Sequence, residues 1–149
     1  MSSEVRQKVA GLCFSLGLGA STTSAWQPRD PWPPPLASHV MTYVSTLSRV
    51  VLFGGTNPAR EMSATLWSWD GVSWVVLDED GPSPRIHAGM AYDTGRDRLL
   101  VFGGIGSDGK TLADTWEWDG EQWMEIVTRG LGPGPRDHHA LAYDPVRES

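Results

Sequence analysis

Short apolar runs alternate with polar turns along this chain, and the pattern predicts β-strands. Residues 50–53 and 99–102 are unbroken apolar runs, which suit strands that are covered on both faces. Trp67 and Trp69 are two residues apart, so their side chains lie on one face of a strand. An Asp-Gly pair at 70–71 then leads into another run that contains Trp, which is a strong hairpin signal. We therefore expect an all-β chain of short antiparallel strands.

The pattern repeats with a period of 49 residues. A Phe-Gly-Gly segment at 53–55 recurs at 102–104, and a Trp-x-Trp-Asp-Gly segment at 67–71 recurs at 116–120. A later tryptophan keeps the same spacing in both copies, so chance does not explain the match. The residues that define the repeat are paired glycines and tryptophans, namely Gly54, Gly55, Gly103, Gly104, Trp67, Trp69, Trp74, Trp116, Trp118 and Trp123.

A third copy begins upstream and is fainter. The interval of 13 residues from Trp26 to His39 matches the interval that leads to His87, and this alignment places Ala37 where the later copies have Arg85 and Arg136. The repeat therefore begins at residue 26.

Each period contains four strand candidates, which in the second copy are residues 88–92, 98–102, 114–118 and 123–127. Four antiparallel strands in about 50 residues correspond to one blade of a β-propeller. The expected strands are one near Trp26, four in each complete repeat, and one at 138–143.

The double glycine after an apolar strand, the paired aromatics that follow and the closing Trp resemble the kelch motif, particularly its Trp-rich bacterial form. The resemblance covers residues 26–144. It implies a toroid of blades in which the first strand of each repeat is innermost. In the kelch domains that this chain resembles, the loop that enters the innermost strand can line the mouth of the channel, and Arg85 and Arg136 match that position.

The fold class is therefore a kelch-type β-propeller fragment of about two and a half four-stranded blades, over residues 26–149. A closed propeller takes about four to eight blades. Joining copies of this chain would leave two middle strands missing at each joint, with exposed strand edges. We therefore expect a truncated product or a fragment of a longer protein.

Residues 1–25 have the order of a secretory signal peptide. Arg6 and Lys8 precede an apolar run at 9–20, and small residues follow. We expect a secreted or periplasmic protein, or a cytoplasmic one if this segment is a disordered leader and not a signal. The run is too short to span a bilayer, which takes about 20 apolar residues.

Charge and cysteine content narrow the set of partners. The net charge is -6 and no run of Lys or Arg is present, which argues against nucleic acid and anionic membrane surfaces as partners. The single cysteine excludes a disulfide within the chain and a cysteine-based zinc site. We expect no cofactor.

Two motifs could suggest ligand chemistry, and both have simpler explanations. The G-x-G-x-x-G pattern at 104–109 leads into a strand, whereas a dinucleotide site needs a helix there. His87 and His138 occupy equivalent positions in successive blades, so we expect them to point toward different stretches of the channel and to hold no metal.

These observations favour an interaction or scaffold module without catalytic residues. Arg85 and Arg136 are candidate contacts for an acidic protein partner, and Trp32 is the tryptophan expected to be exposed. The alternatives are a fragment of a kelch-like propeller enzyme, either a copper-radical oxidase or a sugar isomerase, and a carbohydrate-binding module that stacks Trp on glycans. The three tyrosines are repeat landmarks and do not supply a copper site.

Overall fold

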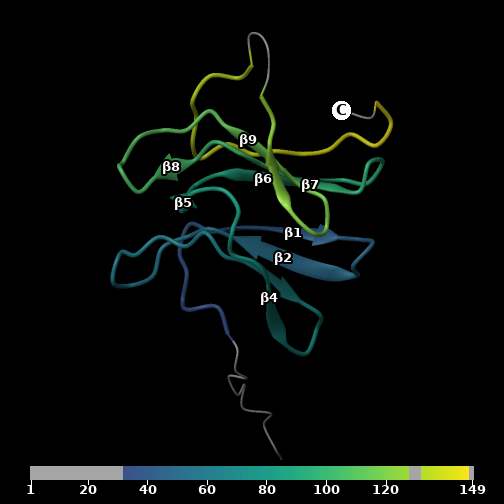
Figure 1. Ribbon diagram of the computed structural model, residues 1–149, viewed down its shortest axis with the longest axis horizontal. Helices are drawn as coiled ribbons and strands as arrows, with labels where there is room; N and C mark the ends of the chain where they lie inside the picture. The colour runs from purple at the N-terminus through teal and green to yellow at the C-terminus, as the bar shows by residue number, and fades with distance from the viewer. Residues whose placement is uncertain (1–31, 128–131, 148–149) are drawn as a thin grey trace, which may run out of the picture.

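The computed structural model describes residues 32–127 and 132–147, and these form two four-stranded antiparallel sheets that lie one over the other (Figure 1). We call the sheets blade 1 and blade 2. Blade 1 has the strand order β1-β2-β3-β4, with β1 Val40–Val44, β2 Arg49–Phe53, β3 Leu66–Trp69 and β4 Trp74–Asp78. Blade 2 has the order β6-β7-β9-β10, with β6 Gly89–Asp93, β7 Arg98–Phe102, β9 Thr115–Trp118 and β10 Trp123–Glu125.

The predicted repeat is confirmed in three dimensions. Each strand of blade 2 begins 49 residues after its counterpart in blade 1. In each blade the first strand pairs with one neighbour only and forms one edge of the sheet. The four strands predicted for the second copy are all present, with boundaries that differ by at most two residues from those expected.

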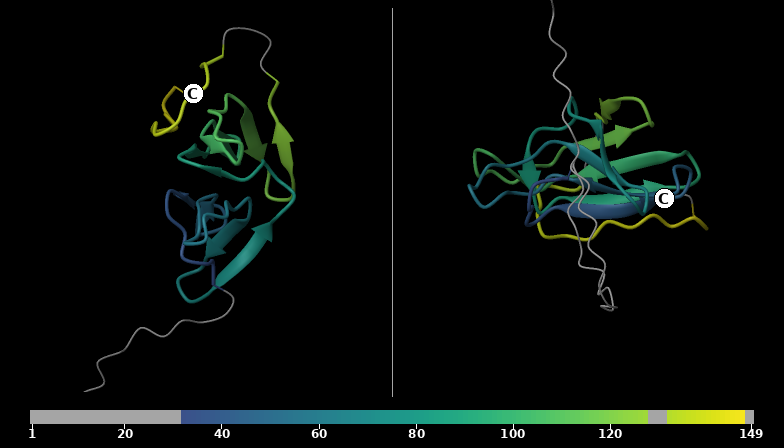
Figure 2. Two further views of the ribbon diagram at one scale, coloured as in Figure 1. Left: turned by 90° about the vertical axis from the view of Figure 1, so that its left-hand side faces the viewer. Right: turned by 90° about the horizontal axis from the view of Figure 1, so that it is seen from below.

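The predicted strand at 138–143 is absent, and the strand expected near Trp26 lies outside the described residues. Residues 132–147 run along the side of blade 2 that faces away from blade 1 (Figure 2, left). A Cβ added to Gly89 of β6 would lie 2.6 Å from Nε2 of His139 and 3.1 Å from Cβ of Leu141, so this segment covers β6 closely. No described strand pairs with it, which explains why it forms no ladder.

The alignment of the upstream copy was wrong by one residue. Two-residue strands β5 (Arg85–Ile86) and β8 (Ile105–Gly106) pair so that Ile86 lies opposite Ile105, and the matching bridge in blade 1 joins Ala37 to Thr56. Ala37 is therefore the counterpart of Ile86, and Leu36 takes the position of Arg85. The match between His39 and His87 misled the alignment, because the true counterpart of His87 is Ser38.

Ser38, His87 and His138 link the repeats head to tail. All three have a left-handed backbone, with φ of 60°, 55° and 54°. The amide of His87 donates to the carbonyl of Ser38, and the amide of His138 donates to the carbonyl of His87, both at 3.1 Å. Each repeat thus offers one donor and one acceptor at the entrance to its first strand.

The main core lies between the blades. Blade 1 contributes mainly aliphatic side chains and a phenylalanine, whereas the face of blade 2 is richer in aromatics. The buried cluster comprises Val44, Val51, Phe53 and Leu66 from blade 1, Ala88 immediately before β6, and Met90, Tyr92, Leu99, Val101 and Trp118 from blade 2. Trp123 packs against Phe53 with ring centroids 5.5 Å apart. Trp118 and Trp123 therefore take part in the packing of one blade against the other.

The paired glycines have positive φ, at +71° and +97° for Gly54 and Gly55, and at +61° and +97° for Gly103 and Gly104. They also allow close backbone contact. A Cβ on Gly104 would lie 2.7 Å from the carbonyl oxygen of Ile86, so a side chain cannot fit without displacing the backbone.

Candidate functional site

Arg85, one of the two arginines predicted to contact a partner, is buried within blade 2. Its side chain is fully covered, and its terminal nitrogens donate to both carboxylate oxygens of Asp114 at 2.8 Å. Further hydrogen bonds go to the carbonyl of Gly103 at 3.0 Å and to Ser83. The guanidinium is thus used entirely inside the molecule, and this corrects the expectation that Arg85 faces a partner.

The Arg85–Asp114 pair shapes the local electrostatics. Burial opposes ionisation of Asp114, but hydrogen bonds from Arg85 and from Trp116 hold its pKa below the ordinary value. Nε1 of Trp116 donates to Asp114 at 2.7 Å. In blade 1 the equivalent positions are Leu36 and Thr65, so both members of the pair are replaced together.

The loss of the carboxylate in blade 1 has a visible effect. Trp67, the counterpart of Trp116, is buried, and its Nε1 has no hydrogen-bond partner among the described residues. The two blades therefore differ at these positions, because blade 2 has a charged pair that supplies an acceptor to Trp116, whereas blade 1 has two uncharged residues.

Arg136 is exposed, unlike Arg85. Its Nε donates to the carbonyl of Gly134 at 3.1 Å, as Nε of Arg85 does to Ser83, and its guanidinium carbon lies 6.0 Å from the centroid of the Phe102 ring. Within the part of the chain that the structure describes, its two terminal nitrogens make no hydrogen bond. The two terminal nitrogens of Arg136 therefore remain available as donors in a partly fixed geometry.

Trp32 packs against blade 1 and is only partly exposed, which corrects the expectation of a free surface residue. Its ring lies 6.2 Å from that of Trp69, and Trp69 lies 5.5 Å from Trp74. The three indoles form a continuous aromatic cluster on the face of blade 1 that points away from blade 2.

That open face of blade 1 repeats the face by which blade 2 packs against blade 1. Met90 and Tyr92 are 8% and 7% exposed, whereas their counterparts Met41 and Tyr43 are 46% and 56% exposed. The same residue types thus occupy the same register in both blades. The matched residues of the open face are Met41, Tyr43, Val50, Leu52, Trp69 and Trp74, the counterparts of Met90, Tyr92, Leu99, Val101, Trp118 and Trp123.

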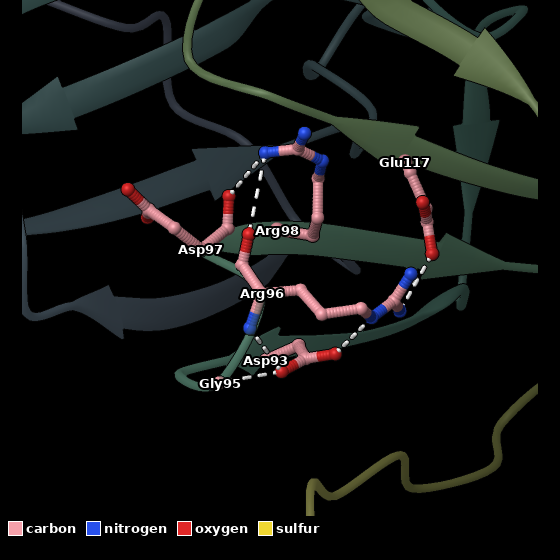
Figure 3. A network of polar contacts seen from close by, with 6 residues as sticks. All are labelled: Asp93, Gly95, Arg96, Asp97, Arg98 and Glu117. Atoms are coloured by element: carbon pink, nitrogen blue, oxygen red, sulfur yellow. Dashed lines mark hydrogen bonds and ion pairs between the residues drawn. The ribbon is translucent and has the colours of Figure 1, made fainter. Parts of the chain in front are cut away.

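In blade 2 a polar network holds the turn between β6 and β7 (Figure 3). Arg96 bridges Asp93 at 2.7 Å and Glu117 at 2.8 Å, while the Asp93 carboxylate also accepts from the amides of Gly95 and Arg96. Burial would raise the pKa of Asp93, but these hydrogen bonds keep it below its ordinary value. Hydrogen bonds to Glu117 and Asp93 raise the pKa of Arg96.

Asp93 and Glu117 both pair with Arg96, so these three residues fix the turn and present no free acid or base. The turn at residues 144–147 repeats part of it, because Asp144 accepts from Arg147 at 2.8 Å and from the amide of Val146 at 2.9 Å.

His87 and His138 come together, contrary to the expectation that they point to separate stretches of the channel. Their rings are stacked with centroids 3.6 Å apart and planes inclined by 22°. The inter-repeat hydrogen bond between the two residues brings the rings into register. Within the described ranges no group of three or more His, Cys, Asp or Glu side chains is arranged to hold a metal ion.

The described residues include no helix that is long and apolar enough to cross a membrane.

Comparison with known proteins agrees with the blade architecture. The chain matches the KLHDC2/KLHL20/DRC7 Kelch-repeats domain over residues 5–146, and a search of curated proteins found no match. Domains of this class generally act as protein-interaction modules. With two four-stranded blades in register and a match over most of its length, the chain belongs to the kelch-repeat family.

Proposed function

We propose that this protein is a non-catalytic interaction module whose docking surface is the open face of blade 1. One observation carries the proposal: Met41 and Tyr43 are exposed, while the same residues one repeat later are buried against another blade. An exposed apolar face with the residue pattern of a buried interface is suited to bind a protein surface.

The partner surface that fits is the face of another kelch-type blade. Blade 1 itself shows the required complement, since it meets Met90 and Tyr92 with aliphatic side chains and Phe53. We propose that further repeats of a longer polypeptide supply this blade. Arg136, in the segment on the far side of blade 2, is a candidate contact for a separate acidic partner, since its terminal nitrogens suit a carboxylate.

Replacing Met41 with Glu tests the docking surface. We expect the free energy of unfolding to change by less than about 0.5 kcal/mol, because the side chain is half exposed, and we expect weaker binding of hydrophobic dyes and less self-association. The matched control, Met90→Glu, places a charge in the core between the blades and is expected to destabilise the protein by several kcal/mol, on the order of 3. Urea denaturation, dye fluorescence and light scattering measure these effects.

Equal destabilisation by the two variants, or unchanged dye binding and self-association in Met41→Glu, would count against this surface. The alternatives predict other results. A carbohydrate-binding module would show quenching of Trp fluorescence by glycans, and a propeller oxidase would retain a metal after purification.

We also propose that the protein is exported. The order of basic, apolar and small residues at 1–25 supports this. The family match begins at residue 5, however, and so assigns most of the same segment to the kelch-repeat domain. Amino-terminal sequencing of the mature protein distinguishes the two, because cleavage after Ala25 leaves Trp26 as the first residue.

A further inference from the structure

Three histidines lie where the segment 132–147 meets blade 2. We call this segment the docked segment. His138 stacks on His87 with centroids 3.6 Å apart, and the side chain of His138 also contacts the carboxylate of Asp137. His87 belongs to blade 2's entry loop and His138 to the docked segment, so the stack joins two separate parts of the chain.

His139 is the second link. Its ring meets Phe102 edge to face with centroids 5.3 Å apart, and it lies directly against Gly89 of β6. Both ring nitrogens are buried and have no hydrogen-bond partner among the described residues. A neutral imidazole is tolerated here, but a charged one would lie in an apolar site without a counter-ion in contact.

We propose that mild acid releases the docked segment from blade 2 and uncovers a second protein-docking face. Protonation of His87 places a positive charge within the ring stack that it forms with His138, and protonation of His139 places a charge against Phe102. Three backbone hydrogen bonds also link described residues of the segment to blade 2, from Gly104 to Arg136, from Arg136 to Leu112 and from His138 to His87. Side-chain hydrogen bonds join Thr111 to Asp137 and Tyr143 to Asp93.

The charged groups around the histidines define the direction of the effect. Burial lowers the pKa of His139 and Arg136 lowers it further, while Asp137 opposes both. Burial also lowers the pKa of His87, with the neighbouring His138 adding to the shift and Asp137 again opposing it. Because the docked state has the lower pKa, docking is fully stable above the ordinary value of 6.5 and weakens as the pH falls below it toward the lowered values.

Release exposes a surface that corresponds to a known interface. Phe102 is the counterpart of Phe53, which Trp123 covers in the contact between the blades. In the docked state His139 and Arg136 cover Phe102 instead. The uncovered face therefore suits the aromatic side of another kelch-type blade.

Hydrogen exchange of the full chain at about pH 7.5 and pH 5 tests the proposal. After correction for intrinsic exchange rates, protection of the Gly104, Arg136 and His138 amides is expected to fall about tenfold or more at the lower pH. Protection of Val51, in the core between the blades, should change much less. Unchanged protection at the three linking amides, or an equal loss at Val51, overturns the proposal.

Variants separate protonation from general acid effects. His87→Asn and His138→Asn keep a residue that tolerates the left-handed backbone, and His139→Gln keeps a neutral polar side chain. The triple variant should lose most of the pH response. His39→Gln is the matched control, because His39 lies two repeats upstream of His139. It is outside the contact between the docked segment and blade 2, and its Nδ1 lies near the carbonyl of Leu36.

If Gln at position 139 undocks the segment at every pH, His87→Asn alone still decides the question. Removing one member of the stack must reduce the loss of amide protection at low pH while leaving the segment docked at neutral pH. A triple variant or a His87→Asn variant with the same pH response as the parent would overturn the proposal.

Discussion

Replacing Gly104 with Val is expected to destabilise the protein by about 3 kcal/mol or more. The residue has φ of +97°, which a β-branched side chain tolerates badly, and a Cβ would lie 2.7 Å from the carbonyl oxygen of Ile86. The amide of Gly104 also donates to Arg136, so a backbone shift would break a link to the docked segment. Thermal and urea unfolding measure the effect.

Gly120 is a matched control for this experiment. Its φ of +103° is similar, but nothing lies within 4 Å of an added Cβ. Gly120→Val should therefore show only the conformational cost, about 1 to 2 kcal/mol. Equal losses in the two variants would mean that backbone crowding at Gly104 contributes nothing.

Arg85→Leu is the second substitution expected to have a large effect, with a loss of about 3 kcal/mol. Removing the guanidinium leaves the Asp114 carboxylate without its bidentate partner and the Gly103 carbonyl without a donor. The expected loss is at the lower end of the range usual for removing one member of a buried ion pair, because the side chain of Asp114 is 23% exposed. The measurement is urea denaturation at neutral pH.

The double variant Arg85→Leu with Asp114→Thr should recover much of that loss. It reproduces in blade 2 the pair that blade 1 already uses, Leu36 and Thr65. Replacing both members removes the carboxylate that Arg85→Leu leaves unpaired, and an unpaired buried charge is the main cost of removing one member alone. A double variant as unstable as Arg85→Leu would show that blade 2 does not tolerate the residue pair found in blade 1.

The pair also makes stability depend on acid. Because the pKa of Asp114 is lowered in the folded protein, its contribution is complete above the ordinary value of 3.8 and is lost as the pH falls through the lowered value. The histidine effect begins as the pH falls below 6.5 and that of Asp114 only below 3.8, so the onset of acid release can be measured while the Arg85–Asp114 pair is still charged.

The features of the fold that depend on chain geometry were predictable from the sequence. Glycine pairs mark positive φ, and Trp spacing marks one face of a strand, so the register of the two blades followed from residues such as Gly104 and Trp118. Residues 138–143 of the docked segment were predicted as a strand because they repeat the residues of the first strand of the preceding copy. A strand also needs a partner, and pairing depends on a second segment that a local pattern does not contain.

The site was less predictable, because its properties depend on contacts between distant residues. Arg85 and Arg136 occupy equivalent sequence positions, yet one is buried by Asp114 and the other is exposed. The histidine stack was missed for a similar reason. Equivalent residues in neighbouring blades were expected to be separated, but the left-handed backbone at His87 and His138 turns both rings to the same junction.

The head-to-tail link between repeats has a consequence for how such chains change in length. Ser38 and His87 are 49 residues apart and His87 and His138 are 51 apart, yet the two hydrogen bonds have the same length of 3.1 Å. The extra residues fall between Trp123 and Arg136, outside the link. Lengthening a repeat within this connection therefore preserves both the donor and the acceptor, so the backbone link between successive repeats tolerates repeats of unequal length.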